Sequence, residues 1–230
     1  MNASVRRRDR CMRAVQELLG FLRKDDSPKA TMAELQERFL APSAILETTP
    51  HELGKVSLSE SEAQLLSLIP GLTRHAMRTS LGDHPMLGNL LSAAQYLRTL
   101  FIGVPIEQFY LLCMDESGRL IQCRLLQSGS IDETPFYLGN LLQCVVSTGA
   151  RAVVLSHNHP GGTPRPSQAD VRCTIDALRA LLPLNVTLLD HIIIADGRAV
   201  SLRLESYIAD PLWNRQQSAG PLFWHWTDPE

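Results

Sequence analysis

The stretch VVLSHNHPGGTPRPSQAD, residues 153–170, decides how this chain folds. A short apolar run ends in two histidines one residue apart, His157 and His159, and a segment rich in proline and glycine follows. Ser167 and Asp170 then stand three residues apart before an amphipathic pattern, which is the spacing of a helical capping box. The stretch therefore predicts a buried strand, a sharp turn and a capped helix.

The two histidines are candidate metal ligands. Because side chains at i and i+2 lie on one face of a strand, both imidazoles should point the same way where the strand ends. Asp170 is a candidate third ligand, and two histidines with one carboxylate leave a fourth tetrahedral position for water, as in catalytic zinc sites. The capping box alone also explains Ser167 and Asp170. These residues by themselves therefore leave two interpretations open, a metal site and a capped helix without a metal.

The sequence around this stretch predicts an α/β layer with a mixed sheet. Two apolar runs joined at 115–118 have the pattern of a β-hairpin, and three further strand patterns alternate with helical ones. The expected order is β-β-α-β-α-β-β, in which helices flank one sheet. The expected elements are a hairpin at 108–129, helices at 134–150 and 167–184, and strands at 151–157, 185–197 and 198–204.

A small helical domain is expected before this layer. Residues 1–84 show short helical patterns without strand signals, and Thr31 and Glu34 have the spacing of another capping box. A turn-rich segment separates them from the layer at 85–208. Residues 209–230 form a tail that contains all three tryptophans.

Composition indicates an ordinary globular protein of a reducing compartment. The net charge of −2 provides no overall field that would attract nucleic acid or a membrane. No apolar run approaches the ~18 residues of a membrane span, and the basic N-terminus lacks the apolar segment of a secretory signal. The five cysteines form no Cys-x-x-Cys pair, as expected of free thiols. We therefore expect a cytoplasmic protein without membrane contact.

The full spacing of the opening stretch carries a resemblance. His157-x-His159, a seven-residue spacer that begins with Pro160 and leads to Ser167, and Asp170 three positions later resemble the pattern of the JAMM metalloproteases. The form SHNHPGGTPRPSQAD, with the later LLDHIIIADGRAVSL and the earlier EQFYLLCMDESGRLI, resembles the RadC family of bacterial JAMM-domain proteins. The resemblance implies a JAMM/MPN-type fold, which is cytidine-deaminase-like, and one zinc ion per chain held by His157, His159 and Asp170.

The resemblance also implies catalytic roles. Glu107, just ahead of FYLLCMD, matches the glutamate that the family uses as general base. Ser167 would cap the helix and also donate a hydrogen bond to an oxyanion. The implied function is zinc-dependent hydrolysis of a peptide or isopeptide amide bond in a peptide or protein substrate. The alternative is a DNA-repair-associated accessory protein that binds nucleic acid and has a non-catalytic metal site.

Two regions depart from the family pattern. Proteins similar to RadC begin with a helix-hairpin-helix region, whose glycine turn presents N–H groups to DNA phosphates. Here the chain reads GKVSLSESEAQLL, with Ser57, Ser59 and Glu60 in place of the glycines. Glu60 and Glu62 would face phosphate, so the hairpin is degenerate and DNA binding is doubtful.

The aromatic tail is the second departure. We expect it to fold back on the preceding domain. If it were exposed instead, it would be a docking patch for a protein partner, since tryptophan is enriched in interface hot spots. The residues concerned are Trp213, Phe223, Trp224 and Trp226.

Overall fold

The structure, a computed structural model, consists of two compact units, Met1–Ala76 and Met77–Glu230. It describes residues 3–23, 28–39, 42–129, 134–160 and 163–209, and residues 211, 213 and 224, although not the side chains of 3–11, 42–43 and 134–137. The domain boundaries expected at 84 and 208 stay predictions. No described helix combines the length and the apolar character that a membrane crossing requires.

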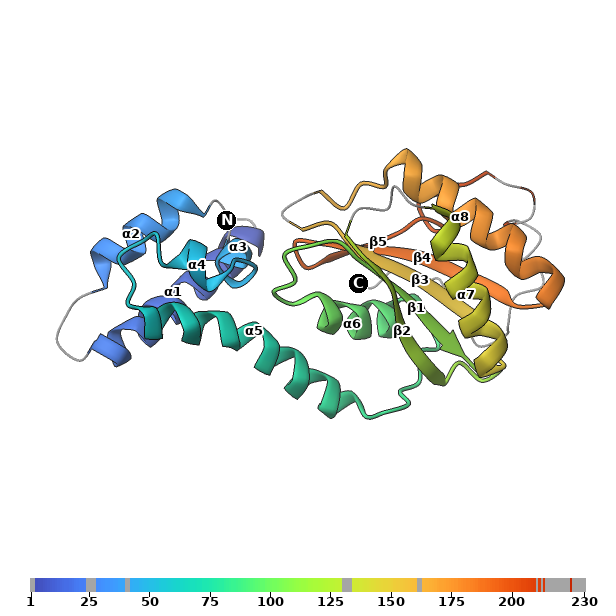
Figure 1. The fold of residues 1–230 in the computed structure, drawn as a ribbon, viewed down its shortest axis with the longest axis horizontal. Helices are drawn as coiled ribbons and strands as arrows, with labels where there is room; N and C mark the ends of the chain where they lie inside the picture. Colours follow the sequence, from blue (N-terminus) through green and yellow to red (C-terminus); the bar gives the residue numbers. More distant parts are fainter. Residues whose placement is uncertain are drawn as a thin grey trace. The chain divides into compact units, whose positions relative to one another are not determined.

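The N-terminal unit is helical, as expected (Figure 1). Its core includes Val15 and Leu19 of the first helix and Leu66 of the last, all buried. The helices are α1 (Ala3–Arg23), α2 (Lys29–Arg38), α3 (Pro42–Leu46), α4 (Pro50–Leu53) and α5 (Glu60–Leu81), of which α5 continues into the second unit.

The capping box expected at Thr31 is wrong. Helix α2 already begins at Lys29, so Thr31 lies within its first turn. The Glu34 carboxylate instead accepts a hydrogen bond from the backbone N–H of Ser57 at 2.7 Å. The capping preference of Thr31 therefore did not set the start of α2, because Glu34 bonds to Ser57, which is distant in the sequence, and not to Thr31.

A capping box does form where the hairpin glycines would have been. Ser59 precedes α5, its hydroxyl accepts from the N–H of Glu62 at 3.3 Å, and the Glu62 carboxylate accepts from the N–H of Ser59 at 2.7 Å. The same carboxylate binds the Arg23 guanidinium at 2.6 and 3.0 Å. These hydrogen bonds, that of Arg23 foremost, lower the pKa of Glu62 to about 2. An internal anion therefore lies at the N-terminus of α5.

The second unit contains a five-stranded mixed sheet in the order β2-β1-β3-β4-β5. Strand β3 pairs antiparallel with β1 and parallel with β4, and the predicted sequence of strands and helices is confirmed. Helix α6 covers one face of the sheet, and α7 and α8 cover the other (Figure 1). The elements are α6 (Leu90–Phe101), β1 (Gln108–Met114), β2 (Leu120–Ser128), α7 (Thr134–Thr148), β3 (Ala152–Asn158), α8 (Gln168–Leu181), β4 (Thr187–Ala195) and β5 (Arg198–Ser201), with a short 3-10 turn at Leu182–Leu184.

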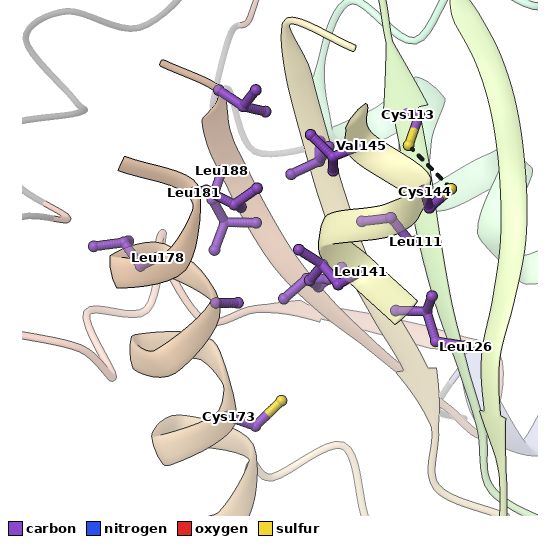
Figure 2. Packing of buried hydrophobic residues seen from close by; sticks show 14 of the residues in the cluster. Leu111, Cys113, Leu126, Leu141, Cys144, Val145, Cys173, Leu178, Leu181 and Leu188 are labelled. Carbon is purple, nitrogen blue, oxygen red and sulfur yellow. Dashed lines mark hydrogen bonds between the residues drawn. The ribbon is translucent and has the colours of Figure 1, made fainter. Parts of the chain in front are cut away.

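Alternation along β3 determines which side chains reach each helix layer. Val153 and Leu155 pack in the cluster beneath α7 and α8, whereas Val154 packs beneath α6. Figure 2 shows the first cluster, in which leucines of both helices contact the strands and the thiols of Cys113 and Cys144 lie 3.7 Å apart. By the same alternation, the side chain of His157, two positions after Leu155, lies on the α8 face.

The pairing of β3 with β4 skips one residue of β4, Leu189. Because strand side chains alternate between faces, a skipped residue reverses the faces of those that follow. After the shift His191 pairs with Leu155 and therefore lies on the α8 face. Its backbone N–H donates to Oδ1 of Asp190 at 2.7 Å, which stabilises the strand next to the irregularity.

Two tryptophans of the tail are buried in the second unit, in agreement with the expectation that the tail folds back. Trp213 is 1% exposed in the α7/α8 cluster, where the guanidinium of Arg203 lies 5.3 Å from its ring centre. Trp224 is 3% exposed in the α6 cluster, so the two rings lie in different cores. Phe223 and Trp226 lie outside the described residues.

Candidate metal centre

His157 and His159 stand at the end of β3, where the predicted strand meets the loop. His157 is fully buried beneath α8, and the ring of Phe109 on β1 stacks on it at a centroid distance of 5.5 Å. The N–H of His159 donates to the carbonyl of Ile194 at 3.0 Å, so pairing with β4 extends past the second histidine. The Nε2 atoms of the two imidazoles lie only 2.9 Å apart.

Asp170 reaches the same point from the first turn of α8. Ser167 is the N-cap, and both hydrogen bonds of the predicted capping box are present. Oδ2 of Asp170 accepts from the backbone N–H and from the hydroxyl of Ser167, each at 2.7 Å. Oδ1 lies 3.1 Å from Nε2 of His157, is buried, and has no hydrogen-bond partner among the described residues.

These three residues form a group that could hold a metal ion. One ligand atom from each of His157, His159 and Asp170 lies within 4.8 Å of the other two. Ligands ~2.0–2.1 Å from a tetrahedral zinc ion lie about 3.3 Å apart. The observed spacings of 2.9 Å between the imidazole nitrogens and 3.1 Å to the carboxylate would have to widen by only a few tenths of an ångström. The donor set therefore fits such an ion.

The electrostatics of the group favour a bound cation. Burial acts to raise the pKa of Asp170, but the imidazoles of His157 and His159 beside it outweigh burial and hold that pKa well below its usual range. The Asp170 carboxylate in turn raises the pKa of His159 against the effect of burial. A buried carboxylate that stays ionised requires positive charge beside it.

Glu107 lies immediately before β1, next to this group. Phe109 pairs with His157 in the antiparallel ladder, and continuing that register by two residues sets Glu107 opposite His159. The negative charge of Glu107 contributes to the raised pKa of His159. The fold thus brings Glu107 close to residues that follow it by fifty positions, although it is not one of the three clustered ligands.

Asn158, which sequence reasoning passed over, holds the backbone on both sides of Glu107. Its Oδ1 accepts from the N–H of Gln108 at 2.8 Å, and its Nδ2 donates to the carbonyl of Ile106 at 3.0 Å. Asn158 is the residue between the two histidines and faces away from them, so one strand end orients both the ligands and the glutamate.

His191 and Thr174 lie behind the ligand group, and the sequence assigned neither of them a role there. His191 is fully buried. Its Nε2 lies 2.8 Å from Nδ1 of His157, and its Nδ1 lies 2.6 Å from the hydroxyl oxygen of Thr174 on α8. Burial lowers the pKa of His191 well below its usual value, so the ring is neutral.

A mixed five-stranded sheet flanked by helices, with a His-His-Asp group where β3 meets the start of α8, defines a domain of the JAB/MPN type. The family model for the RadC-like JAB domain matches residues 87–207. The chain belongs to this RadC family.

Several proteins named UPF0758 are similar to the chain. One from Rhodobacter capsulatus is 30% identical over 187 residues, which cover 81% of this chain and 86% of that protein. The UPF0758 protein Smlt0399 of Stenotrophomonas maltophilia strain K279a is 37% identical over 123 residues, as is a UPF0758 protein of strain R551-3. In both of these cases the match covers 54% of this chain and 53% of the relative.

Proposed function

We propose that this protein is a zinc-dependent hydrolase that cleaves peptide or isopeptide amide bonds. His157, His159 and Asp170 would hold one zinc ion per chain, Glu107 would act as general base, and Ser167 would bind the oxyanion. A zinc ion with three protein ligands acidifies a water molecule and polarises a carbonyl group, which is the chemistry that amide hydrolysis needs.

This proposal rests on potential metal-binding atoms that carry no proton and lie close together. The carbonyl of Thr163 can only accept, so at 3.0 Å it takes a proton from Nδ1 of His159, and a neutral ring then has its lone pair on Nε2. That lone pair and the unpartnered Oδ1 of Asp170 point at the same place, beside Nε2 of His157. A structural core would not bring bare acceptors together, because each costs free energy when it is buried without a partner.

Access to the group fits a catalytic site. The side chain of His157 is fully buried, whereas that of His159 is 16% exposed, so the group opens on the side of His159. Glu107 is partly exposed on that side. It can therefore take a proton from water and pass it to the leaving amine, while Asn158 keeps its backbone in place.

Ser167 is exposed and in reach of a substrate, but its hydroxyl proton points to Oδ2 of Asp170. To bind an oxyanion, the hydroxyl must turn away from that carboxylate. The backbone N–H of Ser167 also donates to Oδ2, so one bond to the ligand persists when the hydroxyl turns. Ser167 can thus serve the oxyanion without releasing Asp170.

We do not favour the nucleic-acid alternative for the helical unit. Glu62 occupies the N-terminus of α5 and pairs with Arg23, so phosphate would meet a carboxylate there. We further propose a reducing, cytoplasmic setting, because the cysteines with described side chains carry free thiols. A protein partner could use Trp213 and Trp224 only after they leave their buried positions.

Two measurements on the full-length protein test the function. Elemental analysis after loading with zinc and desalting should find about one zinc per chain. A panel of peptides and isopeptide-linked conjugates should then be cleaved by the wild type, with a fall in kcat of at least about 100-fold in Glu107→Gln. Glu116→Gln, in the exposed β1–β2 turn, is the matched control and should cleave normally. A zinc-loaded Glu107→Gln variant with full activity would contradict the assignment of the base.

A further inference from the structure

A row of buried polar groups leads away from His157 on the side opposite the ligand cluster. Nδ1 of His157 lies 2.8 Å from Nε2 of His191, Nδ1 of His191 lies 2.6 Å from Oγ1 of Thr174, and that hydroxyl donates to the carbonyl of Asp170 at 2.6 Å. None of these four residues is more than 1% exposed. The row therefore connects the ring of one candidate ligand, His157, with the backbone carbonyl of another, Asp170.

The order of the protons in this row follows from the capacity of each group. A carbonyl can only accept, so the single hydroxyl proton of Thr174 goes to Asp170. Oγ1 of Thr174 must then accept the proton on Nδ1 of His191. In the reverse order, two oxygens would face each other across 2.6 Å without a proton between them.

The remaining assignments follow from the surroundings of His191. Its ring is fully buried, and its two hydrogen-bonding partners, the Thr174 hydroxyl and the His157 imidazole, supply no negative charge that would stabilise a cation there. With one proton, on Nδ1, its Nε2 carries a lone pair and accepts from Nδ1 of His157. A neutral His157 that is protonated at Nδ1 has its own lone pair on Nε2. That nitrogen is the one that lies 2.9 Å from Nε2 of His159 and 3.1 Å from Oδ1 of Asp170.

We propose that Thr174 and His191 are positioning residues that hold His157 in the Nδ1-protonated tautomer, so that its Nε2 is presented to the metal. The inference rests on the proposed metal site, because a histidine that only filled the core would have no need of one tautomer. Neither Thr174 nor His191 contacts the nitrogen and oxygen atoms that would bind the metal. Partners of this kind, behind a metal-binding imidazole, fix its orientation and its basicity.

Helix α8 links the two sides of the site. Asp170 provides a carboxylate at its N-terminal turn, and Thr174, one turn later, binds the Asp170 carbonyl and starts the row toward His157. Residues four apart lie on one helix face, so a single helix both supplies one ligand and orients another. The skipped residue Leu189 is required as well, because it turns His191 toward α8.

The tautomer can be measured without any metal. Ring ¹⁵N chemical shifts of the metal-free, full-length protein, recorded at mildly alkaline pH with long-range proton–nitrogen correlations, distinguish the two neutral forms of each histidine. We expect His157 in the wild type to carry its proton on Nδ1. In Thr174→Val, where a methyl group replaces the hydroxyl, we expect a mixture of the two forms. Thr174→Ser keeps the hydroxyl and should restore the wild-type pattern.

Zinc affinity, measured by competition with a chelator, is the second readout. We expect binding to weaken about 10- to 100-fold in Thr174→Val and to recover in Thr174→Ser. Thr99→Val is the matched control. Thr99 lies in α6 and is 1% exposed, and its hydroxyl donates to the carbonyl of Tyr96 at 2.7 Å, its only hydrogen bond among the contacts described. It should cost similar stability and leave zinc binding unchanged.

The outcomes separate this inference from the proposed function. A wild-type His157 protonated at Nε2 in the metal-free protein, or a Thr174→Val variant with an unchanged tautomer and unchanged zinc affinity, would overturn the positioning role. A wild type that takes up no zinc while His157 shows the expected tautomer would instead overturn the proposed metal site.

Discussion

Replacing Asp170 with asparagine should separate metal binding from folding. In the wild type, Oδ2 accepts two hydrogen bonds from Ser167 and Oδ1 faces Nε2 of His157 at 3.1 Å. Asparagine has the same shape, so its carbonyl oxygen can replace Oδ2 while its amide donates to the lone pair on Nε2. We therefore expect the metal-free variant to have a free energy of unfolding within about 1 kcal/mol of the wild type.

The effect of zinc should differ sharply between the two proteins. Zinc at about 1,000 times its dissociation constant stabilises the folded wild type by about 4 kcal/mol. For a unit of this size, 1 kcal/mol shifts Tm by about 2–4 °C, so zinc should raise Tm by about 8–16 °C. The neutral amide is a poor zinc ligand, and we expect less than a quarter of that shift in Asp170→Asn.

Tryptophan fluorescence is a suitable assay, because Trp213 and Trp224 are buried in the unit that contains the site. Melts would be recorded with a chelator and with added zinc. Asp176→Asn, on the same helix but outside the ligand cluster, is the control and should keep the full shift. An equal zinc shift in Asp170→Asn would contradict the role of Asp170 as a ligand, and an Asp170→Asn protein that is unfolded without metal would contradict the expected stability.

Three further predictions concern the groups around the site and the helical unit. Ser167→Ala should cost about 1 kcal/mol through the lost N-cap, measured by urea unfolding, and Ser167→Thr should recover most of it. Asn158→Ala leaves backbone groups beside Glu107 without partners, so we expect a loss of about 1–3 kcal/mol and faster hydrogen exchange at the Gln108 amide. Glu62 has a folded pKa of about 2 against a usual value of 4.5, so its contribution is present above about pH 4.5 and is lost as the pH falls toward 2. Glu62→Gln should therefore be less stable than the wild type at pH 7 and match it at pH 2, by circular dichroism.

Much of the second unit could be predicted from the sequence because its signals are local. The hairpin turn, the capping box of α8 and the buried β3 run each depend on residues close in the chain. The i, i+2 spacing of His157 and His159 required only a strand, and the seven-residue spacer to Ser167 required only a turn. For these reasons the order of elements and the convergence of the ligand group followed from the printed sequence.

The supporting residues were not predictable, because they depend on pairing between strands. His191 reaches His157 only because β4 skips Leu189, and no local pattern in LLDHIII signals that shift. Asn158 reads as a spacer between histidines until β1 is aligned beside it. The start of α2 was likewise determined by contacts elsewhere in the helical unit, since Glu34 bonds to Ser57 and not to Thr31.

X-ray absorption at the zinc edge of stoichiometrically loaded protein identifies the atoms that bind the ion. We expect one zinc per chain with only nitrogen and oxygen neighbours at ~2.0–2.1 Å and the outer-shell scattering of two imidazoles, those of His157 and His159. A protein that takes up no zinc, or a zinc ion with a sulfur neighbour at ~2.3 Å from one of the cysteines, would contradict this expectation.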